Sequence, residues 1–447
     1  MRAPSGCVTR SLANGARPLT RLWGCKKSLA EIWSGLRLIT RPGSGRMSVD
    51  LRTRVDSEQA PVEAGRFFRE TLPPLLDSHQ AQIAHGASEL PLEDFCIETD
   101  GEPWTLCWHE DRVSVEAGNH GTARVRLTSE QLSDIVNDQS TPVAFMSTRQ
   151  LDMPEGGLPD FLNWWLVLRA ALDGRQIHAR GDVQFDTDIR RSFTPDDSDE
   201  EMRAFLEQAG YLHLQGLFSE EEMAAVEADF PKAAPHFEKG DPRAWFATTQ
   251  DGVEHLVRME GFDRYSEVTV ALIDEERFQR IARIPGVSHT MTRKPGARVG
   301  ALIKPIGVVK GISDVPWHKD CSLGRHSYEC CNLTVGISVT GADASCGQLR
   351  VVPGTHRALV WPAPCVQPGL DLEPIDLPTR TGDVTVHLSC TQHMSQPPVT
   401  KTRKVLYTGF GQQAVDPEAA EANRQRLNTV RSKTHTSISQ QPGYLGN

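Results

Sequence analysis

The segment around residue 320 holds side chains whose types and spacing could bind a metal ion. His318, Lys319 and Asp320 follow one another, and His393 and Arg403 come downstream. Two imidazoles and one carboxylate can hold Fe(II) on one face and leave the remaining coordination positions open. The planar guanidinium of an arginine shortly after the second histidine suits a carboxylate, such as the distal one of 2-oxoglutarate. The set therefore predicts an iron site with His318, Asp320 and His393 as catalytic residues and metal ligands.

Single histidines in this chain carry much less information than the ordered set. The chain contains 15 histidines, so roughly one His-x-Asp triplet is expected by chance. The His-Glu-Asp sequence at 109–111 fits the same pattern, but it lies between two short predicted strands, and we interpret it as a surface turn. His387 competes with His393 as the distal ligand, although its spacing to Arg403 does not suit the anchor. The alternative for each histidine is a hydrogen-bonded core or surface residue.

Strand geometry explains how these residues could converge. In a strand, residues i and i+2 point to the same side, so His318 and Asp320 can reach one ion while Lys319 faces away. His393 follows a predicted turn and strand at 381–388, and Arg403 opens the next strand, 403–410. We expect the strands that carry His393 and Arg403 to pair as a hairpin, which would put Arg403 close to the metal but not on it.

The hydrophobic pattern predicts an α+β protein with two structured parts. Residues 47–192 alternate strand-like and helical stretches and predict a small α+β domain, and the acidic residues 193–200 predict a linker. Helical patterns dominate to residue 284. From 299 to 410, short alternating strands with Gly and Pro turns are typical of a barrel or a jelly roll. The C-terminal domain at 201–435 is thus predicted to be a cupin-like double-stranded β-helix with flanking helices, followed by a polar tail at 436–447.

The overall composition excludes several classes of function. With a net charge of −10, the chain is unsuited to general nucleic-acid binding, because neutralising phosphates needs a basic face. No apolar run approaches the roughly 20 residues of a membrane-spanning helix, so we expect a soluble protein. The 10 cysteines include no C-x-x-C pair. We therefore expect neither a disulfide framework nor a zinc site built on paired thiolates, and we expect a cytoplasmic location.

The first 46 residues differ from the rest of the chain. They are rich in arginine and serine and contain one acid, Glu31. This composition is typical of a mitochondrial transit peptide, which would change the location to mitochondrial. The alternative is a misassigned extension upstream of a true start at Met47. In either case the segment is predicted to be a basic, disordered leader outside the fold.

Several motifs surround the metal residues in a fixed order. They are 210–221, 315–320 (Val-Pro-Trp-His-Lys-Asp), 347–357, 382–383 (Gly-Asp) and 393–395 (His-Met-Ser), followed by Arg403. With these motifs, residues 198–412 resemble the phytanoyl-CoA dioxygenase family. The resemblance implies Fe(II) held by His318, Asp320 and His393, with 2-oxoglutarate and O₂ as cosubstrates. It also implies that Arg403 binds the distal carboxylate of 2-oxoglutarate, that Ser395 donates a hydrogen bond to it, and that Lys304 lies on a strand that walls the cofactor.

The resemblance also implies a reaction. It is that of an Fe(II)/2-oxoglutarate-dependent dioxygenase that hydroxylates an unactivated C–H bond of a small hydrophobic or acyl-linked substrate and releases succinate and CO₂. Related halogenases have a small residue in place of the carboxylate, so Asp320 favours hydroxylation. Two alternatives are the same chemistry on a small polar metabolite and a non-catalytic, cupin-like metal sensor. Relatives commonly have His-Gly-Ser and an Asn where this chain has His-Met-Ser-Gln-Pro-Pro, which puts the substrate-side contacts in doubt but not the metal.

A second resemblance concerns the N-terminal part. The strand pattern of residues 47–192 is similar to that of sterol-carrier-type lipid-binding domains. Trp164 and Trp165 would then face a lipid tunnel, and the alternative is that both belong to an ordinary hydrophobic core.

Overall fold

The structure is a computed structural model, and it describes residues 60–286, 289–291, 293–311, 315–324, 332–412, 417–418, 421–422 and 425. The predicted leader at 1–46 and the predicted tail at 436–447 lie outside these residues. None of the helices in this part of the chain has the length and hydrophobicity that crossing a membrane requires.

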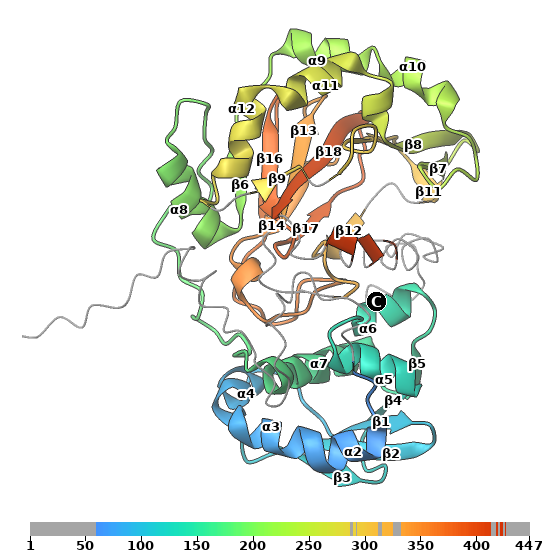
Figure 1. Ribbon diagram of the computed structural model, residues 1–447, viewed down its shortest axis with the longest axis vertical. Coiled ribbons are helices and arrows are strands. Elements are labelled where there is room, and N and C mark those ends of the chain that lie inside the picture. Colours follow the sequence, from blue (N-terminus) through green and yellow to red (C-terminus); the bar gives the residue numbers. More distant parts are fainter. Residues whose placement is uncertain are drawn as a thin grey trace, which may run out of the picture. The chain divides into compact units, whose positions relative to one another are not determined.

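The N-terminal part is built on a small sheet with helices around it (Figure 1). Among the described residues its strand order is β3-β2-β1-β4-β5, and β1 is parallel to β4 while the other pairs are antiparallel. The strands are β1 (Phe95–Thr99), β2 (Glu102–His109), β3 (Arg112–Ala117), β4 (Ala123–Leu127) and β5 (Asp152–Glu155). The helices are α2 (Ala64–Arg66), η3 (Phe67–Thr71), α3 (Leu72–Ser78), α4 (Gln80–Ala87), α5 (Ser129–Val136), α6 (Pro142–Ser147) and α7 (Leu158–Asp173).

Helix α7 forms the centre of the N-terminal core. It ends at Gly174, whose φ of 67° is a left-handed conformation that glycine adopts without steric cost. Trp164 and Trp165 on this helix are both buried in the hydrophobic cluster. The Trp164 indole also donates a hydrogen bond of 2.8 Å to the carbonyl of Glu93. Both tryptophans are therefore core residues, which was the alternative to a lipid tunnel.

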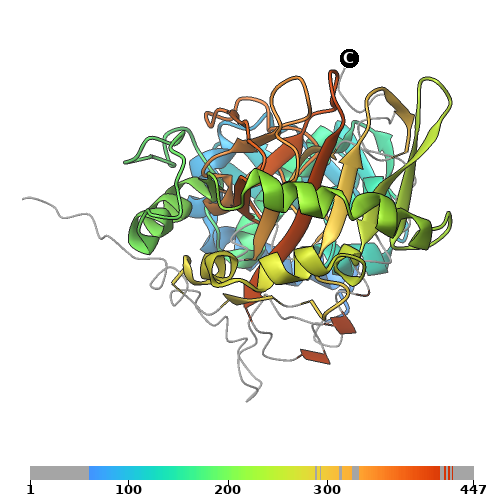
Figure 2. The ribbon, with the colours of Figure 1, turned by 90° about the horizontal axis from the view of Figure 1, so that it is seen from above.

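The C-terminal part consists of two sheets whose described strands are antiparallel and form a jelly roll (Figures 1 and 2). The larger sheet has the order β11-β7-β8-β10-β18-β13-β16-β6, with β9 beside β18, and the smaller sheet has the order β12-β17-β14-β15. The strands of the larger sheet are β6 (Tyr211–Leu214), β7 (Ala244–Thr249), β8 (Glu254–Glu260), β9 (His289–Thr290), β10 (Gly300–Lys304), β11 (Val308–Lys310), β13 (Leu333–Ser338), β16 (Val384–Leu388) and β18 (Arg403–Gln412). Those of the smaller sheet are β12 (Val315–His318), β14 (Leu349–Val352), β15 (Ile375–Leu377) and β17 (Gln392–Ser395).

Helices cover the outer face of the larger sheet (Figure 2). They are α8 (Asp199–Ala209), α9 (Glu220–Glu227), α10 (Phe230–Ala233), η4 (Ala234–His236), η5 (Phe262–Arg264), α11 (Glu267–Asp274), α12 (Glu276–Gln279) and η6 (Arg280–Arg283), and η7 (Thr355–Arg357) lies further along the chain. The prediction that helices dominate up to residue 284 was wrong at β7 and β8. These two strands form a hairpin that extends the sheet through pairing of β8 with β10, a long-range contact that local periodicity does not reveal.

The turn before β16 shows why the family-like Gly-Asp motif is needed structurally. Gly382 has a φ of 85°, and a Cβ at this position would collide with the carbonyl oxygen of Phe218. The buried carboxylate of Asp383 accepts hydrogen bonds from the Arg380 N–H (2.7 Å), the Gly216 N–H (2.9 Å) and His213 Nε2 (3.1 Å). Burial raises the pKa of Asp383, but these hydrogen bonds outweigh it and hold the pKa below its usual value.

The segment 359–363 of the C-terminal part completes the N-terminal core. Leu359, Trp361 and Ala363 belong to the same hydrophobic cluster as α7. The Trp361 indole donates to Oδ1 of Asn163 at 3.0 Å. A second contact, of 2.5 Å, joins the Thr141 hydroxyl to the Ser322 carbonyl, two residues after Asp320. The N-terminal core is therefore shared with segments next to the candidate metal residues.

Candidate active site

Two histidines face each other because of the register of the smaller sheet. Strands β12 and β17 are antiparallel, and His318 lies directly opposite His393. The centres of the two imidazole rings are 4.2 Å apart. Strand pairing, rather than a local motif, therefore brings together residues that are 75 positions apart in the sequence.

Asp320 reaches the two histidines by a route that differs from the predicted one. Strand β12 ends at His318, so Asp320 lies in the turn beyond it, where its N–H donates to the Ser389 carbonyl at 2.7 Å. The explanation from strand alternation was therefore wrong. The expectation for Lys319 was right, since its buried amino group points elsewhere and donates to the Thr355 carbonyl at 2.8 Å.

The three predicted ligands form one cluster of donor atoms. Oδ1 of Asp320 lies 3.7 Å from Nε2 of His318 and 3.8 Å from Nε2 of His393. One ligand atom from each residue lies within 4.8 Å of the other two. Two nitrogens and one carboxylate oxygen at these separations are the donors that a facial Fe(II) site uses.

Hydrogen bonds orient both imidazoles. Nδ1 of His318 lies 2.7 Å from the Pro316 carbonyl, and Nδ1 of His393 lies 2.9 Å from the Thr391 carbonyl. A carbonyl can only accept, so each Nδ1 carries the proton and each Nε2 presents its lone pair to the cluster. The hydrogen bond from Nδ1 to a backbone carbonyl thus selects, in each ring, the tautomer that a metal ligand requires.

The charges of the cluster agree with this arrangement. Burial raises the pKa of Asp320, but the surrounding imidazoles, those of His318 and His387 first, hold it well below its usual range. Burial and the neighbouring imidazoles of His387 and His318 lower the pKa of His393 well below its usual value. The site therefore presents an anionic carboxylate beside the neutral imidazole of His393, which is the protonation state in which these two groups bind a divalent metal ion.

Two further side chains lie against the other oxygen of Asp320. The Thr334 hydroxyl on β13 donates to Oδ2 at 2.6 Å. Nε2 of His387 lies 3.5 Å from the same oxygen, and its ring centre is 4.0 Å from that of His393. Within the described residues, neither ring nitrogen of His387 makes a hydrogen bond, although the side chain is buried. His387 is thus next to the site but outside the three-donor cluster.

Arg403 lies in the larger sheet, not in a hairpin with the strand of His393. Strand β17 pairs with β12 and β14, whereas β18 pairs with β10 and β13, so the predicted hairpin was wrong. The prolines at 397 and 398 occupy the connection between the two sheets and cannot donate to a hairpin ladder. Arg403 consequently lies opposite Lys304 of β10.

Arg403, Lys304 and Ser395 form a buried polar group. Nη1 of Arg403 donates to the Ser395 hydroxyl at 2.9 Å and to the Gly347 carbonyl at 2.6 Å. Nζ of Lys304 donates to the same hydroxyl at 2.8 Å. The Ser395 hydroxyl in turn donates to Gly347 at 3.1 Å, so its hydrogen is not directed at a ligand in this arrangement. The predicted hydrogen bond from Ser395 to 2-oxoglutarate stays a prediction.

The guanidinium of Arg403 has unused capacity to bind an anion. The side chain is 3% exposed, and its Nε is buried without a hydrogen-bond partner in the described part of the chain. Both contacts of its Nη1 are to neutral oxygens. Ser395 and His393 are two residues apart on β17, so they share one face of the smaller sheet. A carboxylate ligand that reached from the three-donor cluster would therefore find a buried cation on the same side.

Some neighbours of the site had no signal in the sequence. Thr334 and the Gly347 carbonyl contact the predicted residues only because distant strands meet. The turn at 353–356 does have a family-like motif, and its contacts are structural. The Thr355 hydroxyl accepts from the Gln392 N–H at 2.8 Å, next to His393, while the Thr355 carbonyl receives Lys319. This turn supports the neighbours of two candidate ligands.

Comparisons with known proteins found one matching family model and several similar solved structures. The family model described as phytanoyl-CoA dioxygenase (PhyH) matches residues 206–405. No curated protein matches the sequence. Among solved structures, AviO1 from Streptomyces viridochromogenes is 18% identical, with a TM-score of 0.39, over 51% of this chain and 99% of its own. EctD from S. alaskensis with bound Fe is 18% identical, with a TM-score of 0.39, over 52% of this chain and 80% of its own. The non-heme alpha ketoglutarate dependent epimerase SnoN from nogalamycin biosynthesis is 17% identical, with a TM-score of 0.37, over 48% and 80%.

Proposed function

Since the family model described as phytanoyl-CoA dioxygenase matches residues 206–405, we propose that the protein is a non-haem Fe(II)/2-oxoglutarate-dependent dioxygenase that hydroxylates a small organic substrate. In this reaction one oxygen atom of O₂ enters the substrate as a hydroxyl group. The other enters succinate, and C1 of 2-oxoglutarate leaves as CO₂. Fe(II) with 2-oxoglutarate supplies the oxidising power for an unactivated C–H bond.

One observation carries the proposal. A cluster of two imidazole nitrogens and one carboxylate oxygen within 4.8 Å lies on the same sheet face as Ser395, which Arg403 contacts. The donor set suits Fe(II), and the buried, unpartnered Nε of Arg403 suits an anionic ligand. The Arg403 Nε–H in particular needs an acceptor, because buried polar atoms are rarely left without a partner.

Each residue then has a defined role. His318, Asp320 and His393 would hold the iron, with the tautomers set by their backbone contacts. Thr334 orients the carboxylate by binding Oδ2, which leaves Oδ1 directed toward both histidines. Arg403 would hold the distal carboxylate of 2-oxoglutarate. Lys304 adds positive charge and fixes the Ser395 hydroxyl on which Arg403 rests.

The substrate that we propose is hydrophobic or acyl-linked. This part of the proposal is supported by the sequence resemblance of residues 47–192 to sterol-carrier-type domains. For the domain boundaries we propose those expected from the sequence, with the oxygenase domain at residues 201–435. Because Leu359, Trp361 and Ala363 complete the N-terminal core, a lipid test should use the full chain. Lipid extracted from the purified protein and identified by mass spectrometry would support this substrate class, and a lipid-free protein would favour a small polar metabolite.

The central experiment measures iron and succinate together. Metal-free protein is loaded with Fe(II) under nitrogen, and iron per chain is measured. Succinate is then followed on exposure to O₂ and 2-oxoglutarate with acyl thioesters, fatty acids and polar metabolites. Asp320→Ala should lose both iron and succinate formation. Asp376→Ala is the matched control, since this exposed carboxylate pairs with Arg350 on the smaller sheet and should leave both unchanged.

The outcomes separate the alternatives. Stoichiometric iron and full turnover in Asp320→Ala would show that the ligand assignment is wrong. Iron bound by the wild-type protein without succinate from any substrate class would favour a metal sensor over an enzyme.

A further inference from the structure

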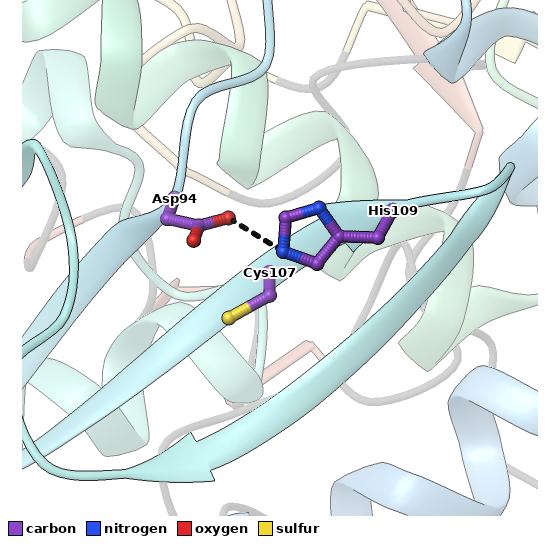
Figure 3. Close-up of side chains that lie close together, drawn as sticks. All are labelled: Asp94, Cys107 and His109. Atoms are coloured by element: carbon purple, nitrogen blue, oxygen red, sulfur yellow. Dashed lines mark ion pairs between the residues drawn. The ribbon is translucent and has the colours of Figure 1, made fainter.

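A second group of potential metal ligands lies in the N-terminal sheet, apart from the candidate iron site. Asp94, Cys107 and His109 each place one ligand atom within 4.8 Å of the other two. Nε2 of His109 is 3.6 Å from Oδ1 of Asp94. Figure 3 shows the carboxylate and the imidazole directed toward one another, with Cys107 beside them on the same strand as the histidine.

The geometry follows from strand pairing. Phe95 of β1 is opposite Leu106 of β2, so the preceding residue, Asp94, lies across from Cys107. Cys107 and His109 are two residues apart on β2 and therefore point to the same side of the sheet. The predicted surface turn follows His109, and Glu110 and Asp111 have φ values of 51° and 59°, as in a tight two-residue hairpin. This hairpin sets His109 at the end of the strand.

The backbone that carries Asp94 is held on both sides. The buried Trp164 indole donates to the Glu93 carbonyl at 2.8 Å, and the Thr122 N–H donates to the Asp94 carbonyl at 2.9 Å. A Cβ at Gly121 would lie 2.8 Å from the Asp94 carbonyl oxygen, so a glycine is needed where the chain passes this point. The carboxylate is thus presented by a fixed segment, which lowers the entropy cost of binding a ligand.

The three donors suit one class of ligand. Carboxylate oxygen, imidazole nitrogen and thiolate sulfur are all zinc ligands, and atoms around one tetrahedral Zn²⁺ lie roughly 3.3–3.8 Å apart. The Asp94–His109 separation of 3.6 Å falls in that range. The imidazole is 69% exposed and can adjust, while Cys107 is 2% exposed and fixed by the sheet. Three protein ligands leave a fourth position for water.

A reactive thiol is the main rival interpretation of this group. Burial, with the carboxylates of Asp94 and Glu116 nearby, raises the pKa of Cys107 to about 11. The thiol is therefore protonated at neutral pH and is a poor nucleophile. A metal ion that bound here would displace that proton.

We propose that Asp94, Cys107 and His109 form a second metal site of this chain, for Zn²⁺ or a similar divalent transition-metal ion. The site is independent of the proposed oxygenase chemistry, because its ligands come from strand β2 of the N-terminal sheet and from the residue that precedes β1. With a metal ion bound it would contain a thiolate, whereas the three donors of the candidate iron site are nitrogen and oxygen.

The thiolate provides a selective spectroscopic signal. Metal-free, reduced full-length protein is titrated with Co²⁺, and the near-ultraviolet thiolate-to-cobalt charge-transfer absorption is recorded. The spectrum of Cys107→Ser, which is close to isosteric, is subtracted from that of the wild type so that other cysteines cancel. We expect a difference band that corresponds to one bound Co²⁺ per chain, in addition to any Co²⁺ held by the candidate iron site, and that disappears on addition of Zn²⁺.

Matched variants locate the site. His109→Ala should weaken the cobalt affinity of this band by at least about tenfold. Cys96→Ser, His120→Ala and Asp320→Ala should retain it, since these residues lie outside the group. Circular dichroism and iron loading should match the wild type in Cys107→Ser. A featureless difference spectrum, or a band whose affinity His109→Ala leaves unchanged, would overturn the proposal.

Discussion

Replacing Arg403 by methionine tests the proposed binding of 2-oxoglutarate most directly. The variant keeps the length of the side chain and removes its charge and donors. Nη1 is already engaged by Gly347 and Ser395, so Nε, Nη2 and the positive charge remain for a carboxylate. A hydrogen bond to a charged group contributes about 1.5–3 kcal/mol. Because Lys304 keeps a second cation nearby, we expect a total loss of about 3 kcal/mol, or about 150-fold in Kd.

The assay is isothermal titration of 2-oxoglutarate into Fe(II)-loaded protein under nitrogen. Iron affinity should stay at the wild-type value, since Arg403 is not among the three donors. Arg350→Met is the matched control, because this arginine lies on β14 and pairs with Asp376. A Kd for 2-oxoglutarate within about threefold of the wild-type value, with iron loading intact, would refute the assignment of Arg403.

Three further predictions concern the surroundings of the site. His387→Phe should weaken Fe(II) binding by about tenfold, because it removes the imidazole beside the candidate carboxylate ligand; complete loss of iron in a competition assay would instead identify His387 as the distal ligand. Gly382→Ala should lower the free energy of unfolding in urea by about 2–4 kcal/mol. The control Gly369→Ala is also at positive φ but has open space around it, so it should lower this free energy by only about 1–2 kcal/mol. Equal losses in the two variants would contradict the predicted clash. Asp383→Asn should cost about 2–3 kcal/mol at pH 7. The pKa of Asp383 is lower in the folded protein, so the carboxylate stabilises the fold above about pH 4, and this contribution falls as the pH drops further. If the free energies of unfolding of variant and wild type differed by the same amount at pH 3.5 and pH 7, this role of the carboxylate would be contradicted.

The sequence was informative where chemistry depends on residue type and order. The His-x-Asp triplet, a later histidine and an arginine ten residues after it were sufficient to predict the three donors that cluster in the structure. The alternating strands predicted a barrel or a jelly roll, and the structure has the jelly roll. The turn at 109–111 was also predicted correctly, because it lies between two short alternating segments of the sequence.

The strand pairing that brings the site residues together could not be predicted from the sequence. His318 faces His393 through the register of β12 and β17, and Arg403 belongs to the other sheet, opposite Lys304. The hairpin of β7 and β8 was missed for the same reason. Sequence periodicity reports which side of a strand a residue occupies, but the partner strand is chosen by the total packing of the sheet.

The sequence by itself thus determined the kinds of candidate ligand atoms, their order along the chain and the class of fold. Only the tertiary structure decided which strands meet. It placed Thr334 and His387 against Asp320, and it placed Asp94 across from Cys107. The physical reason is that hydrogen-bonded pairing between distant strands depends on the whole core, and no local pattern encodes it.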